Sequence, residues 1–239
     1  MIILQKQDDR YYVDYKGGQL GWVELYDNPR HTRNCYVKIA LNNLDRTLGK
    51  ELWQKIKEIA GRPLQVMTDE SDVAMTDFLT AGGFVCKRKC YEVTACAEDY
   101  IGGEGRMTLH YCSAGDQVYE DCCRMMYQHY SDAHKAINPL TASFTEFCVE
   151  LPKAAVYAKI NDSIISAAFC ENNEIAYVCS SSEQHFSCFA QSVISSMFKV
   201  YPSISFESDD CDWAAMVLRN MFINQDAMGF CTYVLEDSP

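Results

Sequence analysis

The sequence contains one pattern twice, about one domain length apart. Residues 62–93 read as strand, acidic turn, short amphipathic helix and strand, and residues 203–235 read in the same order. Asp72 in the first copy corresponds to Asp212 in the second, an offset of 140 residues (212 − 72). Solenoid repeats recur at intervals of about 20–50 residues. The longer interval therefore indicates two copies of one globular fold.

The composition is that of a globular protein. The chain has 239 residues, of which 48% are hydrophobic and 23% charged, and its length suits one large domain or two of about 100–150 residues. No apolar run approaches the ~20 residues of a membrane span. The apolar start at residues 1–6 is shorter than a signal-peptide core. We therefore expect a cytoplasmic protein that does not insert into a membrane.

The charge is strongly acidic, with a formal net charge of −12 and an isoelectric point near 4.8. Such a surface repels phosphate backbones, which disfavours nucleic-acid binding. It would attract a cationic substrate such as an amine. A net charge of this sign also serves solubility alone, and the sequence leaves both interpretations open.

The cysteines and histidines show no metal-ligand spacing. None of the thirteen cysteines forms a CxxC pair, and His129 and His134 are five residues apart, which does not place them on one helix face. We therefore predict no metal site. Buried, reduced thiols are the first interpretation of the cysteines, and a nucleophilic or metal-bound thiol is the alternative. Walker, Rossmann and GxSxG motifs are absent from the sequence.

Hydrophobic periodicity predicts the secondary structure. In the first half we predict a hairpin, a third strand and a helix before the first copy of the repeat, at residues 11–15, 20–26, 35–41 and 46–60. In the second half we predict a strand, two helices, three strands and a long helix before the second copy, at residues 107–111, 116–130, 141–151, 154–159, 164–169, 175–179 and 184–200. The glycine-rich residues 98–106 are the predicted linker.

This order of elements resembles the GNAT superfamily of acyl-CoA-dependent N-acyltransferases, in tandem form. The resemblance implies an α/β (α+β) fold with two GNAT-like modules, each a mixed, mostly antiparallel sheet flanked by helices. The first module would span residues 1–98 and be truncated at its N-terminus. The second would span residues 107–239 and be complete.

In that family a loop patterned Gln/Arg-x-x-Gly-x-Gly/Ala holds the pyrophosphate of coenzyme A at a helix N-terminus. Backbone N–H groups there point outward and carry partial positive charge. In the first module Arg46 and Gly49 match the pattern, whereas Glu51 departs from it. In the second module Ala190 matches, and His185 stands in place of the usual Arg or Gln.

The strand at 174–179 resembles the family's fourth strand, whose backbone pairs with the pantetheine arm. An ordinary strand followed by a serine-rich N-cap is the alternative. The resemblance implies acetyl-CoA as cosubstrate and contacts to it from the following residues of the second module: Tyr177, Val178, Ser180, His185, Phe186, Ser187, Cys188, Phe189 and Ala190.

The implied reaction is attack of an amine on a thioester. It needs a base for the amine and a backbone N–H donor for the oxyanion. We predict Glu207 as the base, with Glu174 as the second candidate. The alternative for Glu207 is an acidic loop that caps the next helix, where Asp212 is a natural N-cap.

The departing thiolate benefits from an acid, usually a tyrosine on the last helix of the family's fold. That position holds Phe78 in the first copy and Leu218 in the second, and neither donates a proton. Tyr91 and Tyr233, on the strands that follow, are possible substitutes, with Tyr233 in the second copy as the catalytic candidate. The alternative is that both tyrosines only pack.

The leading hypothesis is an N-acyltransferase that transfers an acetyl or other acyl group from coenzyme A to a small-molecule or peptide amine, with the second module as the working one. The rival is a catalytically degenerate GNAT-fold protein that binds coenzyme A or another protein. A third hypothesis is transfer through Cys188, whose predicted place at a helix start would favour the thiolate. None of the three predicts an oligomeric state.

Overall fold

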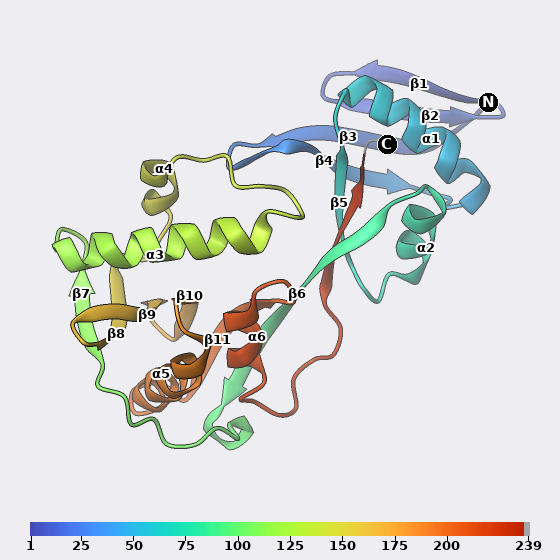
Figure 1. Ribbon diagram of the computed structural model, residues 1–239. Coiled ribbons are helices and arrows are strands. Elements are labelled where there is room, and N and C mark those ends of the chain that lie inside the picture. The colour runs from blue at the N-terminus through green and yellow to red at the C-terminus, as the bar shows by residue number, and fades with distance from the viewer. Residues whose placement is uncertain (237–239) are drawn as a thin grey trace. The chain divides into compact units, whose positions relative to one another are not determined.

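A computed structural model describes residues 1–236 (Figure 1). The chain divides into two compact units. The first comprises Met1–Lys89, Ala136–Thr141 and the residues from Met228 on, and the second comprises Cys90–Lys135 and Ala142–Ala227. Within the described residues, no helix is long and apolar enough to span a bilayer.

The first unit is a sheet with two helices. Its strands are β1 (Ile2–Gln7), β2 (Arg10–Tyr15), β3 (Gly18–Asn28), β4 (His31–Leu41), β5 (Leu64–Asp69), the first residues of β6 (Val85–Cys96) and β12 (Phe230–Leu235). Its helices are α1 (Arg46–Ala60) and α2 (Val73–Ala81). Among the described residues no helix precedes α1. β1 lies outside the strands predicted from the sequence.

The second unit has a sheet and four helices in the described part of the chain. Its elements are the rest of β6, η1 (Ala97–Asp99), β7 (His110–Ser113), α3 (Gln117–His134), α4 (Phe144–Val149), β8 (Ala154–Ile160), β9 (Ser163–Glu171), β10 (Glu174–Ser180), α5 (Glu183–Met197), β11 (Ser203–Asp209) and α6 (Trp213–Arg219). The strands of the chain are hydrogen-bonded in the order β1-β2-β3-β4-β5-β12-β6-β11-β10-β9-β8-β7. Parallel pairs occur at β4–β5 and β10–β11 within a mostly antiparallel sheet, which confirms the predicted fold class.

The strand order shows that the two copies of the repeat exchange their last strands. In the first unit β12 pairs with β5, with Phe230 opposite Asp69 and Leu235 opposite Leu64; Figure 1 shows this red C-terminal strand beside β5. In the second unit β6 pairs with β11, with Cys96 opposite Ser203. The units therefore differ in their boundaries from the expected division into 1–98 and 107–239, because each sheet includes a strand from the other copy.

The core of the first unit forms around α1. The helix has the predicted bounds, because Asp45 caps its start and Gly61, in the left-handed region at φ 66°, ends it. Its buried stripe includes Trp53, which is 0% exposed and meets the Phe84 ring edge-on at a centroid distance of 4.9 Å. A Cβ at Gly82 would lie 2.1 Å from Cδ1 of Trp53, so this position requires glycine.

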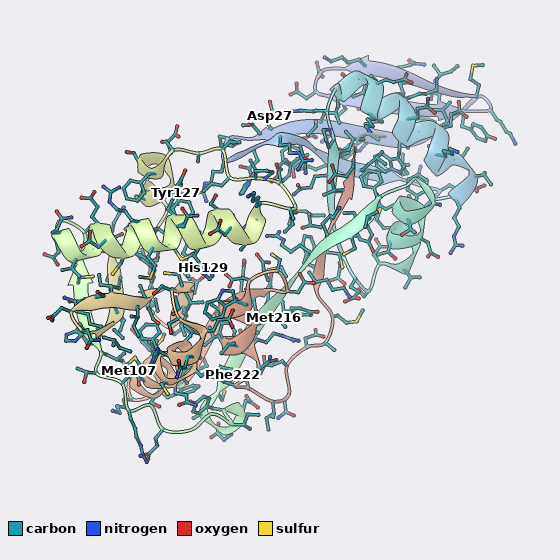
Figure 2. The ribbon with its side chains drawn as sticks, viewed as in Figure 1. Asp27, Met107, Tyr127, His129, Met216 and Phe222 are labelled. Atoms are coloured by element: carbon teal, nitrogen blue, oxygen red, sulfur yellow. The ribbon has the colours of Figure 1, made fainter. Side chains whose placement is uncertain are left out.

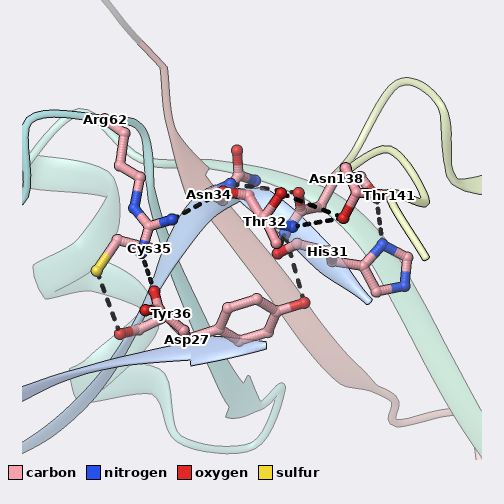
Figure 3. A network of polar contacts seen from close by, with 9 residues as sticks. All are labelled: Asp27, His31, Thr32, Asn34, Cys35, Tyr36, Arg62, Asn138 and Thr141. Carbon is pink, nitrogen blue, oxygen red and sulfur yellow. Dashed lines mark hydrogen bonds and ion pairs between the residues drawn. The ribbon is translucent and has the colours of Figure 1, made fainter. Parts of the chain in front are cut away.

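A buried polar network holds residues 136–141 in the first unit (Figure 3). Asn138, 3% exposed, donates from Nδ2 to Gln65 Oε1 at 3.2 Å. Asn34 donates from Nδ2 to the carbonyl of Ile137 at 3.1 Å, and His31 Nδ1 lies 2.7 Å from the carbonyl oxygen of Asn138. Because buried polar groups are costly without partners, these bonds fix the segment to β4 and β5.

The core of the second unit forms under α5. The predicted stripe is confirmed, with Phe186 and Phe189 both 0% exposed. They share one cluster with Ile204 and Phe206 of β11 and with Leu218 of α6. The side chains on this stripe are therefore packed in the core and are not available to a ligand.

The glycine-rich residues 98–106, expected to be a linker, lie inside the second unit. The ring of Tyr100 packs against that of Phe222 at 5.5 Å, and its hydroxyl donates to the carbonyl of Gly103 at 2.8 Å. A Cβ at Gly105 would lie 2.1 Å from the backbone of Ser192 on α5. Glycine here permits a close approach to the helix.

We expect Gly105→Ala to destabilise the second unit by about 1–3 kcal/mol, because the added methyl overlaps the α5 backbone. Gly103→Ala is the matched control, since its Cβ would meet its nearest neighbour, Nε2 of Gln191, at an ordinary 3.7 Å. Urea unfolding followed by circular dichroism measures both. Equal stability of the two variants would show that residues 98–106 are not packed as described.

Candidate functional site

The parallel strands of the second unit separate toward their carboxyl ends. β10 and β11 are paired at Glu174 and Ser205, whereas β10 stays paired with β9 as far as Ser180. A bulge in β10 shifts its register between Ile175 and Tyr177. Ligands of α/β sheets commonly bind at the carboxyl ends of parallel strands where neighbours diverge. This opening is therefore the first place to seek a site.

A cavity of about 500 Å³ lies at this end of β10. Its walls come from α3, from the end of β10 with the residue after it, and from the turn and first residue of α6. They are formed by Met125, Gln128, His129, Asp132, Ala133, Ser180, Ser181, Cys211 and Trp213. The volume is within the range of about 300–1,000 Å³ that holds small-molecule ligands.

One residue of the cavity wall, His129, belongs to a histidine–carboxylate pair. His129 Nε2 lies 2.9 Å from Asp212 Oδ1, and the two side chains are 9% and 14% exposed. Figure 2 shows His129 on the side of α3 that faces the strands. An ionised carboxylate only accepts hydrogen bonds, so in neutral His129 the proton is assigned to Nε2. The lone pair is then on Nδ1, which gives the imidazole the form of a base.

Asp212 also holds the start of α6. Its Oδ1 accepts from the backbone N–H of Ala214 at 2.9 Å and of Ala215 at 3.2 Å. The N-cap predicted at Asp212 is confirmed. The corresponding residue of the first copy, Asp72, is also an N-cap and accepts from the N–H of Met75 at 3.0 Å. The carboxylate therefore has a fixed direction before it meets the imidazole.

The sequence analysis missed His129 as a functional residue because it tested the histidines for metal spacing. The available signal was position on the helix. His129 follows Cys122 and Met126, which are 0% and 2% exposed, at helical spacing on the buried face of α3. A polar side chain on that face needs a partner, but its partner is 83 residues away in the sequence.

A second histidine–carboxylate pair does not line the cavity. His134 Nε2 lies 3.4 Å from Asp209 Oδ2, and its ring stacks on that of Tyr130 at 3.9 Å. His134 Nδ1 lies 3.0 Å from the carbonyl oxygen of Tyr130. These contacts give His134 a packing role.

The structure places the two glutamates predicted as bases outside the cavity wall. Glu207 is exposed on β11, opposite Glu92 of β6, and its Oε2 accepts from Cys90 Sγ at 3.7 Å. Glu174 is exposed at the first residue of β10, where the parallel strands are still paired. The structure instead brings the carboxylate of Asp132 to the cavity wall, and it places that of Asp212 against His129.

The strand exchange changes which tyrosine belongs to each sheet. Tyr233 lies opposite Val66 in the first unit, where burial raises the pKa of its hydroxyl. In the second unit Tyr91 lies opposite Ser208 of β11, with the guanidinium of Arg219 3.9 Å from its ring. Of the two candidate tyrosines, Tyr91 is therefore the one whose strand pairs with β11 in the second unit, which contains the cavity.

The positions that a GNAT tyrosine would occupy are core positions in this protein. Phe78 is 0% exposed and its ring lies 5.8 Å from that of Trp53. Leu218 is 2% exposed within the cluster beneath α5. Both side chains face the apolar core, which explains why neither position carries a hydroxyl.

The turn from β10 to α5 is built by serines. Ser180 Oγ accepts from the N–H of Ser182 at 3.0 Å and lies 2.8 Å from Ser166 Oγ. Ser182 Oγ lies 2.8 Å from His185 Nδ1. The first-turn N–H groups of α5 are the groups suited to an anion. Glu183 in the same turn places a carboxylate beside them.

The other predicted cofactor residues fall into three environments. Phe186, Phe189 and Ala190 are buried in the core, as is most of Val178, so their backbones alone are available to a ligand. The ring of Tyr177 packs edge-on against Tyr130 and Phe147. Among the predicted set, the remaining positions on α5 are Ser187, which is half-buried, and Cys188, which is exposed.

Cys188 lies in the second turn of α5 rather than at its start, since the N-cap is Ser182. The helix dipole acts mainly within the first turn, so the physical reason for a reactive thiol at this position is lost. The buried cysteines are held as thiols. Burial raises the pKa of Cys123 to about 12 and that of Cys170 to about 12.

The corresponding turn of the first unit already contains its own anion. Asp45 Oδ1 accepts from the N–H of Thr47 at 2.8 Å, and this bond lowers the pKa of Asp45. Arg46 pairs with Asp77. A Cβ at Gly49 would lie 3.1 Å from the carbonyl oxygen of Phe78, so this glycine permits α1 to pack on α2.

Glu51, which departs from the family pattern, accepts from the N–H of Ile2 at 2.7 Å and holds β1. The acidic residues Asp45 and Glu51, which are unfavourable beside a phosphate, thus each hold a backbone N–H group of the first unit. Within residues 1–236, no three or more His, Cys, Asp or Glu side chains are grouped to hold a metal ion.

No family model matches the sequence, and no curated protein matches it. Among solved structures, a GCN5-related N-acetyltransferase from Sphaerobacter thermophilus aligns over 97% of this chain and 81% of its own length, with a TM-score of 0.54 and 11% identity. One from Kribbella flavida aligns over 100% of this chain and 90% of its own, with a TM-score of 0.50 and 8% identity. This chain has the GNAT fold. The resemblance inferred from the sequence is confirmed at the level of fold, with the repeat as its tandem form.

We expect Asp72→Ala to lower the free energy of unfolding by about 1 kcal/mol, because it removes a helix N-cap. Asp212→Ala should lower it further, because it removes an N-cap and also the hydrogen-bond partner of the buried His129. Only Asp212→Ala should also change the nitrogen NMR shifts of His129, since it removes the acceptor of the Nε2 proton. Asp72→Ala is the matched control for the lost cap. Unchanged His129 shifts in Asp212→Ala would contradict the pair.

Proposed function

We propose that this protein is an acyl-CoA-dependent N-acyltransferase whose second unit transfers an acetyl or other acyl group to an amine. The observation that carries the proposal is that His129, paired with Asp212, lines a cavity at the open end of β10 and β11. A base next to such an opening is what amine acylation requires. The GNAT fold and the acetyltransferase names of its structural relatives support the reaction class.

His129 takes a proton at Nδ1 from the attacking amine nitrogen. As that nitrogen forms its bond to the thioester carbonyl carbon, the negative charge on the carbonyl oxygen is met by a backbone N–H near the end of β10. The carbon–sulfur bond then breaks, and His129 returns the proton to the departing sulfur. Asp212 stabilises the imidazolium between the two transfers. The products are an amide and the free thiol of coenzyme A.

The serine turn after β10 and the first-turn N–H groups of α5 would hold the phosphates of coenzyme A. Among the residues predicted for this role, His185 and Ser187 have side chains outside the core, while Phe186, Phe189 and Ala190 would contribute through their backbones. The first unit is the weaker candidate, because Asp45 already occupies the start of α1.

Glu207 is the second candidate for the base. Its exposed carboxylate on β11 would act through a water. Tyr91 is the candidate acid in this sheet, in place of Tyr233. We further propose that the protein acts in the cytoplasm, where reducing conditions keep cysteines as thiols, the form in which all thirteen occur here.

We expect His129→Gln to lower kcat by about 10²–10⁴-fold, the usual contribution of a general base, while acetyl-CoA binding stays intact. His134→Gln is the control, because it breaks the other histidine–carboxylate pair, away from the cavity. Turnover is followed by thiol release with a panel of amines. A full loss in Glu207→Gln with normal turnover in His129→Gln would instead assign the base to Glu207.

We expect calorimetric titration with acetyl-CoA to show one site per chain. His185→Glu should weaken binding at least tenfold, because it adds a carboxylate beside the start of α5. Arg46→Glu makes the same test at the start of α1 in the first unit and should bind as the wild type does. Loss of binding only in Arg46→Glu would place the cofactor in the first unit. An absence of binding to the wild type would refute the proposed function.

The alternative is a GNAT-fold protein that binds coenzyme A or a protein partner without catalysis. Phe78 and Leu218 at the acid positions favour it. Binding of acetyl-CoA with no transfer to any amine would select this alternative.

A further inference from the structure

We propose that the acceptor is a short aliphatic diamine and that Asp132 binds its second ammonium group. This inference rests on the proposed function, because it concerns the cavity in which His129 would act. It assigns to Asp132 the choice of substrate, a role separate from proton transfer.

The charges of the cavity wall favour a cation. Asp132 is its one carboxylate, and no Lys or Arg contributes to the wall. Asp212, behind His129, adds a second negative charge. These carboxylates would repel the negative charge of an anionic or zwitterionic acceptor, and no cation in the wall would balance that charge. They attract an ammonium group.

Asp132 is held in place with capacity for a ligand. Gln128 Nε2 donates to its Oδ2 at 3.0 Å from one helical turn earlier, which fixes the carboxylate. An ionised carboxylate offers about four acceptor positions, so one such bond leaves room for an ammonium. Because Asp132 is exposed, an ammonium group that binds there loses little of its hydration, and the free-energy cost of desolvation is small.

The positions of His129 and Asp132 on α3 favour a short acceptor. His129 and Asp132 are three residues apart, and side chains at this spacing have Cβ atoms about 5–6 Å apart on one helix face. A short diamine, with a few methylene groups between its nitrogens, is therefore the class of acceptor that reaches both side chains at once. Met125 and Ala133 supply apolar wall for the methylenes, and the Trp213 ring is suited to a nearby cation.

The test compares 1,4-diaminobutane with 1-aminobutane, which has the same chain and no second ammonium. We measure kcat/KM with acetyl-CoA for wild type, Asp132→Asn and Asp121→Asn. Asp121 is the matched control, since Gln117 donates to it as Gln128 donates to Asp132, and it lies outside the cavity wall. We expect the wild type to prefer the diamine, and Asp132→Asn to lower the ratio of the two kcat/KM values about fivefold, chiefly through KM. Asp121→Asn should keep the wild-type ratio.

Equal kcat/KM for the two amines in the wild type, or an unchanged ratio in Asp132→Asn, overturns the inference and leaves the proposed transferase intact. If no amine is acylated, the proposed function fails. Calorimetric titration with 1,4-diaminobutane alone then decides the inference: binding weakened about fivefold in Asp132→Asn but not in Asp121→Asn supports it, and binding that is absent or unaltered in Asp132→Asn overturns it.

Discussion

The exchange of terminal strands is the constraint on which the rest of the structure depends. β5 is paired along its length with β12, and β11 with β6. Backbone N–H and C=O groups in a sheet need such partners, and an unpaired strand edge invites pairing with another chain. Neither residues 1–98 nor residues 107–239 contain a whole sheet. The two copies of the repeat therefore form two units that depend on one continuous chain.

Asp212 shows how one side chain links folding and chemistry. As an N-cap it satisfies the N–H groups of Ala214 and Ala215, and the same oxygen accepts from His129. Asp72 performs the capping role alone in the first unit. The repeat thus explains why a carboxylate stands at both positions, and α3, which has no counterpart in the described part of the first unit, explains why only one of them gains a histidine.

The two units have the same strand–helix–strand pattern but differ in the polar contacts at the turn where a ligand could bind. In the first unit, Asp45, Arg46 and Glu51 each have an intramolecular partner at or near the start of α1. In the second unit, the turn after β10 is shaped by Ser180 and Ser182. The two frameworks are therefore alike, and they differ in the polar contacts made at the turn before the helix.

The sequence by itself determined the local structure. Helical spacing and caps located α1 with its observed bounds, and the sequence located the N-cap Asp212, because these signals depend on residues within about four positions of each other. Only the tertiary structure decided the partners of β5 and β11, since β6 and β12 have similar patterns and the choice between them is made by packing. It also brought His129 to Asp212 across 83 residues. A short segment of sequence shows that a buried polar side chain needs a hydrogen-bond partner, but it does not show which distant residue provides that partner.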